Sequence, residues 1–271
     1  MPLLPAAKDK TMHPMLNTAI KAARRAASVI QRASNNLDVI RVERKEHNSF
    51  VTEVDRAAEA AIVDTLLEAY PKHAILAEEG GARGDNEYTW IIDPLDGTTN
   101  YLHGFPQYCV SIALEHRGQI TQAVIYDPNR NDLFTGSRGA GAFLNDRRIR
   151  VSKTRELSDA LVCTGFPYSN FSKLDTYMGM FKDVVQKTAG VRRPGAAALD
   201  LAYVACGRFD GFWELGLSPW DIAAGSLIIL EAGGLITDLD GETGYLESGN
   251  VVAGTPKVFA PLLQTLQAHT N

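Results

Sequence analysis

The segment WIIDPLDGTTN, residues 90–100, constrains the fold of this chain more than any other stretch. Three apolar residues that suit a buried strand lead directly into Asp93, and the proline that follows prevents a helix from continuing there. Because Pro94 rules out a helix here, we expect both Asp93 and Asp96 to lie in a turn at the end of the strand. Gly97 lets the backbone approach a ligand closely, and Thr98 adds a hydroxyl beside exposed amides. The segment therefore predicts a polar site at the end of a buried strand.

The order of the other elements indicates a layered α+β fold. Helical signals come first, an antiparallel set of strands follows, and strands and helices alternate in the last third. Such a pattern predicts sheets sandwiched by helices. The expected helices cover 13–34, 54–70, 176–187, 196–206, 219–231 and 257–268, and the expected strands cover 74–77, 89–92, 108–115, 119–126, 132–136, 161–164, 209–214, 235–238 and 251–253.

Length and composition suit one globular domain. The chain has 271 residues, of which 45% are hydrophobic, and this is enough to fill a core. Residues 1–11 contain two prolines and a charged tail, so we expect a tag or an extended, disordered start outside the fold. The domain is then expected over 12–271, with an N-terminal half of about 12–150 and a C-terminal half of about 151–271.

Charge and cysteine content exclude several classes of partner. A formal net charge of −5 gives no overall positive field for nucleic acid or an acidic membrane surface, so we expect no direct sequence-specific binding of nucleic acid. The longest apolar stretch, 222–236, contains a glutamate and several glycines and is shorter than the roughly 20 residues that span a bilayer. The 3 cysteines are far apart and odd in number, which favours a reducing cytoplasm over a disulfide scaffold.

Acidic residues gather at element boundaries in four places. Magnesium prefers a tight octahedron of oxygen ligands, so a phosphate-cleaving site needs several carboxylates in one small volume. Taken singly, Asp55 and Glu79 are explained as well by a helix cap or a solvated loop acid. The four places together predict a divalent-metal site. They are Asp55 before a helix, Glu78 and Glu79 after a strand, Asp93 and Asp96, and Asp221 at the start of a helix.

The spacing of Asp93 and Asp96 separates two phosphatase mechanisms. Haloacid-dehalogenase-type phosphatases carry DxDGT, in which the first aspartate is a covalent nucleophile. Here the two acids are three residues apart rather than two, so they do not share one face of an extended strand. This geometry favours metal bridging with a water nucleophile.

Several segments resemble the signatures of the inositol monophosphatase family. They are WIIDPLDGTTN, AEEG upstream and SPWDIAAGSLIILEAGG downstream, and the similarity runs from about Met12 to the end. The segments TGFPY, AALDLAYVACGRFDGFWELGLSPWD and NVVAGTPKV resemble bacterial SuhB-type members most. The resemblance implies an αβαβα sandwich of the inositol monophosphatase and fructose-1,6-bisphosphatase type. It also implies a lithium-sensitive, magnesium-dependent phosphatase and a homodimer.

The resemblance also implies metal ligands for two or three Mg²⁺ ions. The first ion would take Glu78, Asp93, the carbonyl of Leu95 and Thr98. The second would take Asp93, Asp96 and Asp221, and a third, weaker ion would sit mainly on Glu78.

Catalytic and substrate-binding residues follow from the same resemblance. Thr98 with Asp55 would orient the attacking water, and Glu78 would act as ligand and base. Glu214 is the best candidate for selecting a polyol, because a carboxylate accepts from two vicinal hydroxyls. Position 196 is often threonine in the family but is alanine here, which removes one hydroxyl. The implied substrate contacts are Asp96, Gly97, Thr98, Gly195, Ala196, Ala197, Glu214 and Asp221.

Function is left with alternatives at this point. The first is hydrolysis of inositol 1-phosphate and related polyol phosphates. Fructose 1,6-bisphosphate or a 3′-phosphonucleotide is a neighbouring substrate class, although no extra basic pocket is evident in the sequence. A non-catalytic alternative comes from SuhB-type members, which are associated with ribosomal RNA antitermination through NusA and RNA polymerase.

The resemblance also implies a lid over the metal site. The lid segment 45–55, with Lys45 and Asp55, is expected to border this site.

Overall fold

The computed structural model describes residues 13–34, 42–46, 49–167 and 171–270, and for 42–46 and 49–51 it describes only the backbone. The expected extended start and the side chain of Lys45 lie outside this description. The division of the domain near residue 150 stays a prediction. Among the described residues, no helix is both long and apolar enough to cross a membrane.

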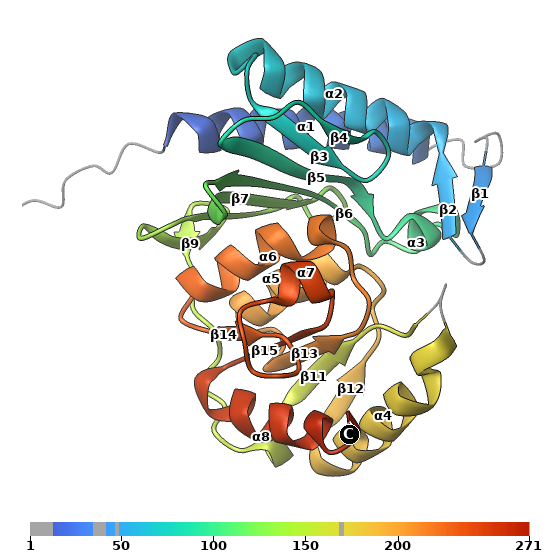
Figure 1. Cartoon of the computed structure of the whole chain (residues 1–271), viewed down its shortest axis with the longest axis vertical. Helices are drawn as coiled ribbons and strands as arrows, with labels where there is room; N and C mark the ends of the chain where they lie inside the picture. The colour runs from blue at the N-terminus through green and yellow to red at the C-terminus, as the bar shows by residue number, and fades with distance from the viewer. Residues whose placement is uncertain (1–12, 35–41, 47–48, 168–170, 271) are drawn as a thin grey trace, which may run out of the picture.

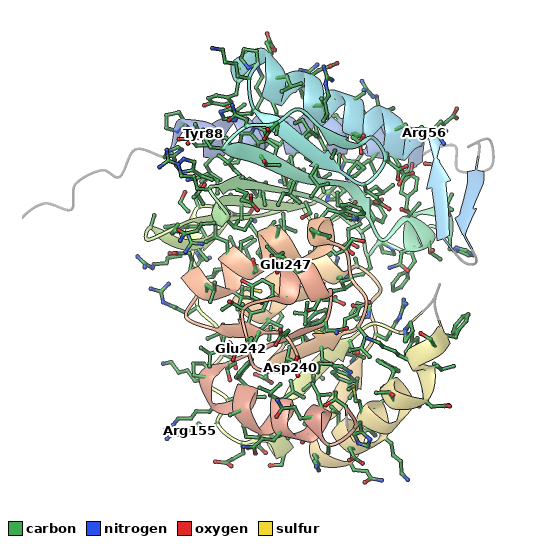
Figure 2. The ribbon with its side chains drawn as sticks, in the orientation of Figure 1. Arg56, Tyr88, Arg155, Asp240, Glu242 and Glu247 are labelled. Carbon is green, nitrogen blue, oxygen red and sulfur yellow. The ribbon has the colours of Figure 1, made fainter. Side chains whose placement is uncertain are left out.

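Five layers stack in the order helix, sheet, helix, sheet, helix, which confirms the predicted sandwich (Figure 1). Side chains fill the spaces between the layers (Figure 2). The outer pair of helices on one side is α1 and α2, the central pair is α5 and α6, and the outer pair on the other side is α4 and α8. Their bounds are α1 Pro14–Ala33, α2 Glu53–Ala69, α4 Leu174–Lys187, α5 Ala197–Ala205, α6 Pro219–Glu231 and α8 Pro256–Gln267.

The first sheet has eight strands in the order β10-β9-β8-β7-β6-β5-β3-β4. β3 and β5 are parallel, and the other neighbours are antiparallel, so the predicted antiparallel set of strands is confirmed. The strands are β3 Ala74–Ala77, β4 Gly81–Arg83, β5 Tyr88–Asp96, β6 Cys109–His116, β7 Gln119–Asp127, β8 Asp132–Ser137, β9 Gly141–Leu144 and β10 Arg147–Arg148. A separate hairpin joins β1 Val42–Glu46 and β2 Ser49–Thr52.

Both faces of the first sheet are buried along its central strands, which explains why β5 and β6 are largely apolar, whereas the edge strands β4 and β10 are exposed. Along β5, Trp90 and Ile92 pack with α1 and α2, whereas Ile91 packs with α5 and α6. Successive side chains of a strand point to opposite faces, so one strand serves both layers. The sheet thereby holds the end of β5 in a fixed place between the helix pairs.

The second sheet has five strands in the order β12-β11-β13-β15-β14. β11 runs parallel to β12 and β13, and β15 runs antiparallel to β13 and β14. The strands are β11 Leu161–Thr164, β12 Gly190–Arg192, β13 Gly211–Glu214, β14 Leu235–Thr237 and β15 Val251–Gly254. The short helical segments are α3 Thr98–Leu102, α7 Tyr245–Ser248, η2 Leu157–Asp159 and η3 Phe171–Lys173.

The end of β5 differs from the expectation. The strand does not stop at Ile92 but continues through Pro94 to Asp96, and its register against β6 shifts between Asp93 and Asp96. The proline lacks an amide hydrogen, and a local irregularity accommodates it. The prediction that both carboxylates lie in a turn was therefore wrong: they lie on either side of a bulge within one strand.

Candidate metal centre

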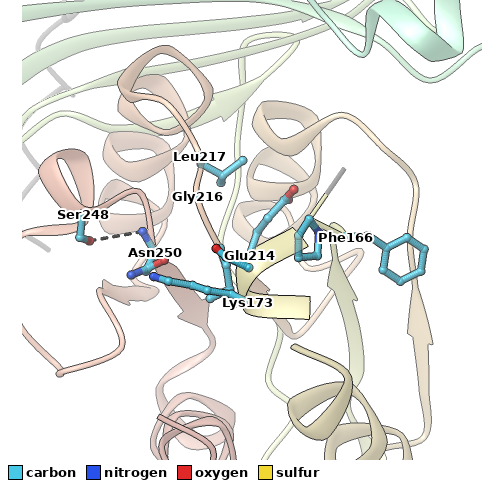
Figure 3. Close-up of a pocket in the computed structure, with 10 residues that line it drawn as sticks. Phe166, Lys173, Glu214, Gly216, Leu217, Ser248 and Asn250 are labelled. Atoms are coloured by element: carbon cyan, nitrogen blue, oxygen red, sulfur yellow. Dashed lines mark hydrogen bonds between the residues drawn. The ribbon is translucent and has the colours of Figure 1, made fainter. Parts of the chain in front are cut away.

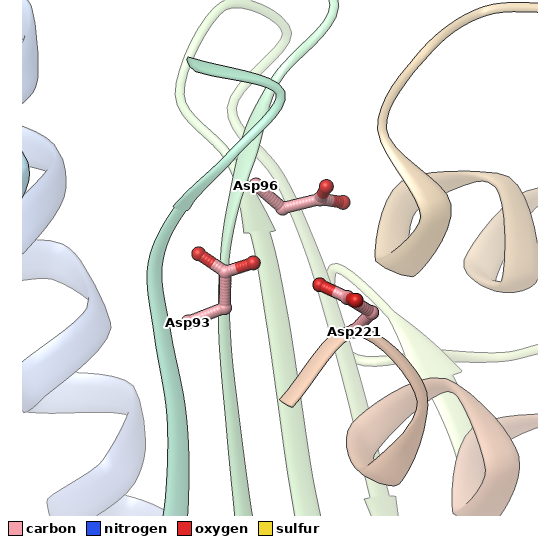
Figure 4. A group of neighbouring side chains, drawn as sticks. All are labelled: Asp93, Asp96 and Asp221. Carbon is pink, nitrogen blue, oxygen red and sulfur yellow. The ribbon is translucent and has the colours of Figure 1, made fainter. Parts of the chain in front are cut away.

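Three aspartates from two distant parts of the chain converge beside the first sheet (Figure 4). Asp93 and Asp96 come from the end of β5, and Asp221 comes from the first turn of α6. One carboxylate oxygen from each lies within 4.8 Å of the others. Oxygen atoms gathered at this spacing are the kind of ligands that magnesium and calcium take in proteins.

Backbone amides orient each of these carboxylates. The amide of Leu95 donates to Asp93 Oδ1 at 2.9 Å, and the amide of Ala198, in the first turn of α5, donates to Asp96 Oδ2 at 2.8 Å. The amide of the N-cap residue of α6 donates to Asp221 Oδ2 at 2.8 Å, as part of a capping box. Amides of β5, α5 and the N-cap of α6 thus orient the three carboxylates, which come from β5 and α6.

Burial makes the charged form of these three carboxylates unfavourable unless a cation lies between them. It raises the pKa of Asp93 well above its usual range, and the charges of Glu78, Asp96 and Asp221 raise it further. Burial also raises the pKa of Asp96 to about 6, against hydrogen bonds from the amides of α5 that lower it. For Asp221, burial and then the charge of Asp96 raise the pKa. A divalent cation would relieve this repulsion, so the donor set fits such an ion.

Glu78 and Leu95, two further predicted ligands, lie next to the cluster. Glu78 directly follows β3, and its amide donates to the carbonyl of Ile92 at 3.1 Å. Its charge raises the pKa of both Asp93 and Asp221. The carbonyl oxygen of Leu95 accepts a hydrogen bond from the hydroxyl of Thr98, so it faces the start of α3.

Thr98 and Asp55, which were predicted to act as a pair, are hydrogen-bonded to each other. Thr98 Oγ1 lies 3.0 Å from Asp55 Oδ1 and also 3.0 Å from the carbonyl oxygen of Leu95. Asp55 is buried at the start of α2, where it closes a capping box with Thr52. Burial raises the pKa of Asp55, and hydrogen bonds from Thr52 and Thr98 lower it. The helix start therefore fixes the carboxylate that positions the hydroxyl of Thr98.

Gly97 packs against the predicted substrate loop. Its φ is +90°, and a Cβ atom there would lie 2.9 Å from the carbonyl oxygen of Gln107 and 3.2 Å from Cβ of Ala196. A side chain at this position would therefore be strained and would push the loop away. The amides of Ala197 and Ala198 point toward Asp96, whose pKa they lower. The segment that carries Asp96 and Gly97 is thus in contact with the loop at Gly195.

Asn100 joins these segments, and sequence reasoning missed it. Its Nδ2 lies 2.8 Å from the carbonyl oxygen of Gln107, 2.9 Å from that of Pro194 and 3.2 Å from that of Gly195. One amide group thereby connects α3 to a loop more than 90 residues away. Asn100 is the last letter of the DGTTN run, which was a signal that could have found it.

Glu214 ends β13 and is only 6% exposed. Burial raises its pKa to about 8, Arg193 lowers it, and the charges of Asp221 and Asp96 raise it. A Cβ atom at Gly165 would collide with the Glu214 carboxylate. Neither Gly165 nor Arg193 was predicted as a site residue, because no local pattern marks their proximity to Glu214.

Asp200 is a further acid near the site that was missed. It lies on α5 and is 1% exposed, and its Oδ1 has no hydrogen-bond partner within the part of the chain that the structure describes. Burial raises its pKa well above the usual range, and the charges of Glu214 and Asp96 add to this. A single acid within the otherwise apolar helix AALDLAYVA was a pattern from which a buried acid could have been predicted.

The fold and the site together define a layered α+β protein with a carboxylate centre suited to a divalent cation. A model of the inositol monophosphatase family matches residues 11–271. The chain belongs to this family.

Known proteins similar to the chain carry two kinds of name. A protein of Neisseria meningitidis serogroup B named "Putative Nus factor SuhB" is 56% identical over 260 residues, which are 95% of this chain and 100% of that protein. The crystal structure of SuhB from Bartonella henselae has a TM-score of 0.92 and 43% identity, and the match covers 94% of this chain and 99% of that one. An inositol monophosphatase from Anabaena has a TM-score of 0.81 and 42% identity, over 94% and 95% of the two chains.

Proposed function

We propose that the chain hydrolyses inositol 1-phosphate and related polyol phosphates, with Mg²⁺ as cofactor. The observation that carries the proposal is the convergence of Asp93, Asp96 and Asp221 within 4.8 Å. Membership of the inositol monophosphatase family supports the reaction class. When bound, Mg²⁺ would neutralise the phosphate and lower the pKa of a water ligand.

The ions would be held by Glu78, the three aspartates and the carbonyl of Leu95. Thr98 places its hydroxyl 3.0 Å from Asp55, so its proton can point at this carboxylate. The lone pairs of Thr98 then accept a hydrogen bond from the attacking water and orient it. Glu78 is the group we assign to take the proton of that water.

The substrate would be positioned from both halves of the chain. The amides of Gly97 and Thr98 would donate to phosphate oxygens. Hydroxyls of the alcohol would meet Asp96, Asp221, Glu214 and the backbone of residues 195–197. Because Ala196 offers only its backbone, selectivity among polyols rests mainly on Glu214.

Phosphate release tests this proposal directly. We expect Mg²⁺-dependent release from inositol 1-phosphate, inhibition by lithium, and weaker release from glycerol, sugar and nucleotide phosphates. Asp93→Asn should abolish the activity, whereas Asp240→Asn, at an exposed position beside the second sheet, should not (Figure 2). Fructose 1,6-bisphosphate or a 3′-phosphonucleotide as the best substrate of the panel would contradict the proposed substrate class.

A second candidate function is supported by the names of the relatives. Proteins 47–56% identical to this chain are named Nus factor SuhB or putative Nus factor SuhB. We propose that the chain also binds NusA and RNA polymerase in the cytoplasm, as a homodimer, in ribosomal RNA antitermination. A pull-down with NusA should then succeed for both wild type and Asp93→Asn. Loss of binding in the metal-site variant alone would contradict an independent scaffold role.

A further inference from the structure

Positive charge is concentrated in one short segment, residues 147–155, where the chain passes from the first sheet toward the second. We call this segment the basic edge. It holds five of the 27 lysines and arginines of the chain, and all five are exposed. Only two acids, Asp146 and Glu156, flank it directly, so it keeps a positive charge on a chain whose formal net charge is −5. The five cations are Arg147, Arg148, Arg150, Lys153 and Arg155.

The basic edge begins at a free edge of the first sheet. Asn145 and Asp146 have φ values of +48° and +63° and form a tight two-residue turn, after which β10 pairs with β9. The amide of Ile149 donates to the carbonyl of Ala142 at 2.9 Å. Because backbone groups along an antiparallel edge alternate in direction, the amide and carbonyl of Arg148 point out of the sheet. β10 is the last strand in the sheet order, so no strand in the described part of the chain pairs with them.

The cations of the basic edge form no ion pair with an acid among the described residues. Arg150 donates to two backbone carbonyls, that of Ile149 at 3.0 Å and that of Glu231 at 3.4 Å. The carboxylate of Glu231 accepts instead from the amides of Gly139 and Gly141 at 2.6 and 2.7 Å. The positive charge of this surface is therefore available to a ligand.

Two exposed leucines border the basic edge. Leu230 directly precedes the residue of α6 whose carbonyl accepts from Arg150. Leu235 opens β14, and a Cβ atom on the preceding Gly234 would lie 2.9 Å from Val151. The two leucines are 42% and 41% exposed. The surface thus offers apolar contacts beside its charges.

The basic edge lies apart from the metal centre. Five strand spacings separate β10 from β5 in the first sheet, a distance of about 24 Å. Among the described residues, none of the basic edge lines the pocket to which Glu214 contributes (Figure 3). In Figures 1 and 2, β9, β14 and Arg155 share one side of the molecule. The basic edge is therefore not part of the site proposed for the phosphate ester.

Charge, backbone and leucines together favour an acidic polypeptide as the ligand. A second copy of the chain fits poorly, because two such edges side by side would bring arginines face to face. Carboxylates match guanidinium groups, and an extended backbone can pair with the outward groups of Arg148. A nucleic acid would meet the guanidinium groups too, but it has no strand to pair, and the net charge of the chain opposes it.

We propose that the basic edge binds an acidic, extended polypeptide segment of a partner protein. The carboxylates of this segment contact the arginines, its backbone pairs with Arg148, and its apolar side chains contact Leu230 and Leu235. The partner is defined by this chemistry: a segment in which acidic and apolar residues alternate. The inference goes beyond the proposed phosphatase function and needs neither Mg²⁺ nor catalysis.

The test measures binding of a labelled peptide of alternating glutamate and valine to the full chain by fluorescence anisotropy. The wild type should bind this peptide, and more weakly as salt is added. Arg148→Glu with Arg150→Glu should weaken binding at least about tenfold, because two attractions become repulsions. Arg24→Glu with Arg83→Glu is the matched control and should stay within about twofold of wild type. It reverses two exposed charges, one on α1 and one on β4 at the opposite edge of the same sheet.

A second variant protects the test against a folding defect in β10. Lys153→Glu with Arg155→Glu changes exposed residues outside any helix or strand, and it should also weaken binding of the peptide. Melting temperatures show which variants fold, and if the change at Arg148 and Arg150 unfolds the chain, this second pair decides.

Two further probes separate a paired strand from a mere polyanion. A peptide with proline in place of valine keeps its charge but cannot pair as a strand, so it should bind at least about fivefold more weakly. Oligouridylate of equal length should also bind more weakly than the valine peptide. The inference is overturned if the wild type does not bind the valine peptide, or if the control variant loses as much binding as the basic-edge variants. Equally tight binding of the proline peptide or of oligouridylate would also overturn it.

Discussion

The end of β5 and the end of β13 contribute to one site in different ways. At the end of β5, Asp93, Asp96 and Thr98 lie within six consecutive residues. Within this segment the amide of Leu95 donates to Asp93, and the carbonyl of Leu95 accepts from the hydroxyl of Thr98. At β13, Glu214 is the single site residue, and two other segments shape its surroundings: Gly165 leaves room for its carboxylate, and the charge of Arg193 lowers its pKa. Under the proposed function, the short motif at the end of β5 supplies two of the three clustered aspartates, whereas the choice of substrate would depend on residues spread over the fold.

The largest effect is expected from replacing Asp221, the one aspartate of the cluster that lies far from the other two in sequence. Asp221→Asn removes a charge from α6 but leaves the β5 motif intact. We expect kcat to fall at least about 100-fold, because several carboxylates must hold the cation. Mg²⁺ affinity, measured by calorimetry, should fall with it. Retained affinity and rate would mean that the β5 motif works without α6.

Thr98→Ala tests the hydroxyl that lies beside Asp55. We expect kcat to fall about 100-fold with little change in Mg²⁺ affinity, since water orientation contributes about this factor. The reason is that Thr98 Oγ1 contacts Asp55 and Leu95 but none of the three aspartates. Thr98→Ser, which keeps the hydroxyl, should restore most of the rate. A serine variant as slow as the alanine variant would argue against an orienting hydroxyl.

Asn100→Asp tests the hydrogen bonds that connect the start of α3 to the loop at residues 194 and 195. The new carboxylate would face the carbonyl oxygens of Gln107, Pro194 and Gly195, which now accept from the amide. We expect the substrate loop to shift and KM to rise about tenfold, while Mg²⁺ dependence stays unchanged. Asn17→Asp, exposed on α1, provides the matched charge control. An equal rise of KM in both variants would assign the effect to net charge.

Gly165→Ala tests the surroundings of Glu214 at the end of β13. The added methyl group would collide with the Glu214 carboxylate and displace it. Kinetics should show that kcat/KM for inositol 1-phosphate falls several-fold and that discrimination against glycerol 2-phosphate is lost. Selectivity equal to wild type would mean that Glu214 does not read the alcohol.

The smallest effect concerns stability and pH. Burial raises the pKa of Glu214 from 4.5 to about 8, so between these values the folded chain keeps a proton that the unfolded chain has released. The contribution of this group is therefore present at low pH and is lost as pH rises through this window. In excess chelator, Glu214→Gln should flatten the fall of the unfolding free energy between pH 5 and 8. Glu247→Gln, at an exposed position, should not, and an identical slope in wild type and Glu214→Gln would contradict the assignment.

Sequence patterns predicted most of the fold because its main elements have clear ends. The bounds of β3, β11 and α6 match the expected ranges, and α6 begins with proline behind a serine cap. The continuation of β5 was missed, because a bulge lets pairing resume past a proline. Strands β4 and β12 have three residues each, which is too short for a periodic signal.

The acids of the site were predictable because each stands at the boundary of a helix or strand. Asp93, Asp96 and Thr98 follow from one motif, and Asp221 follows from its place at the start of a helix, while its assignment to an ion shared with Asp93 and Asp96 rested on family resemblance. Asn100 and Gly165 act through contacts between segments far apart in sequence. Such contacts exist only after folding, so the DGTTN run could mark Asn100 as a candidate but could not show which segments it contacts.

The central claim is that the three aspartates form a magnesium centre that hydrolyses phosphate esters. The most direct test is to measure phosphate release from inositol 1-phosphate while Mg²⁺ is titrated into metal-free wild type, Asp93→Asn and Asp240→Asn. We predict activity that rises from zero and saturates with Mg²⁺ in wild type and Asp240→Asn and stays absent in Asp93→Asn. Full activity of the wild type in excess chelator, or of Asp93→Asn with Mg²⁺, would contradict the account.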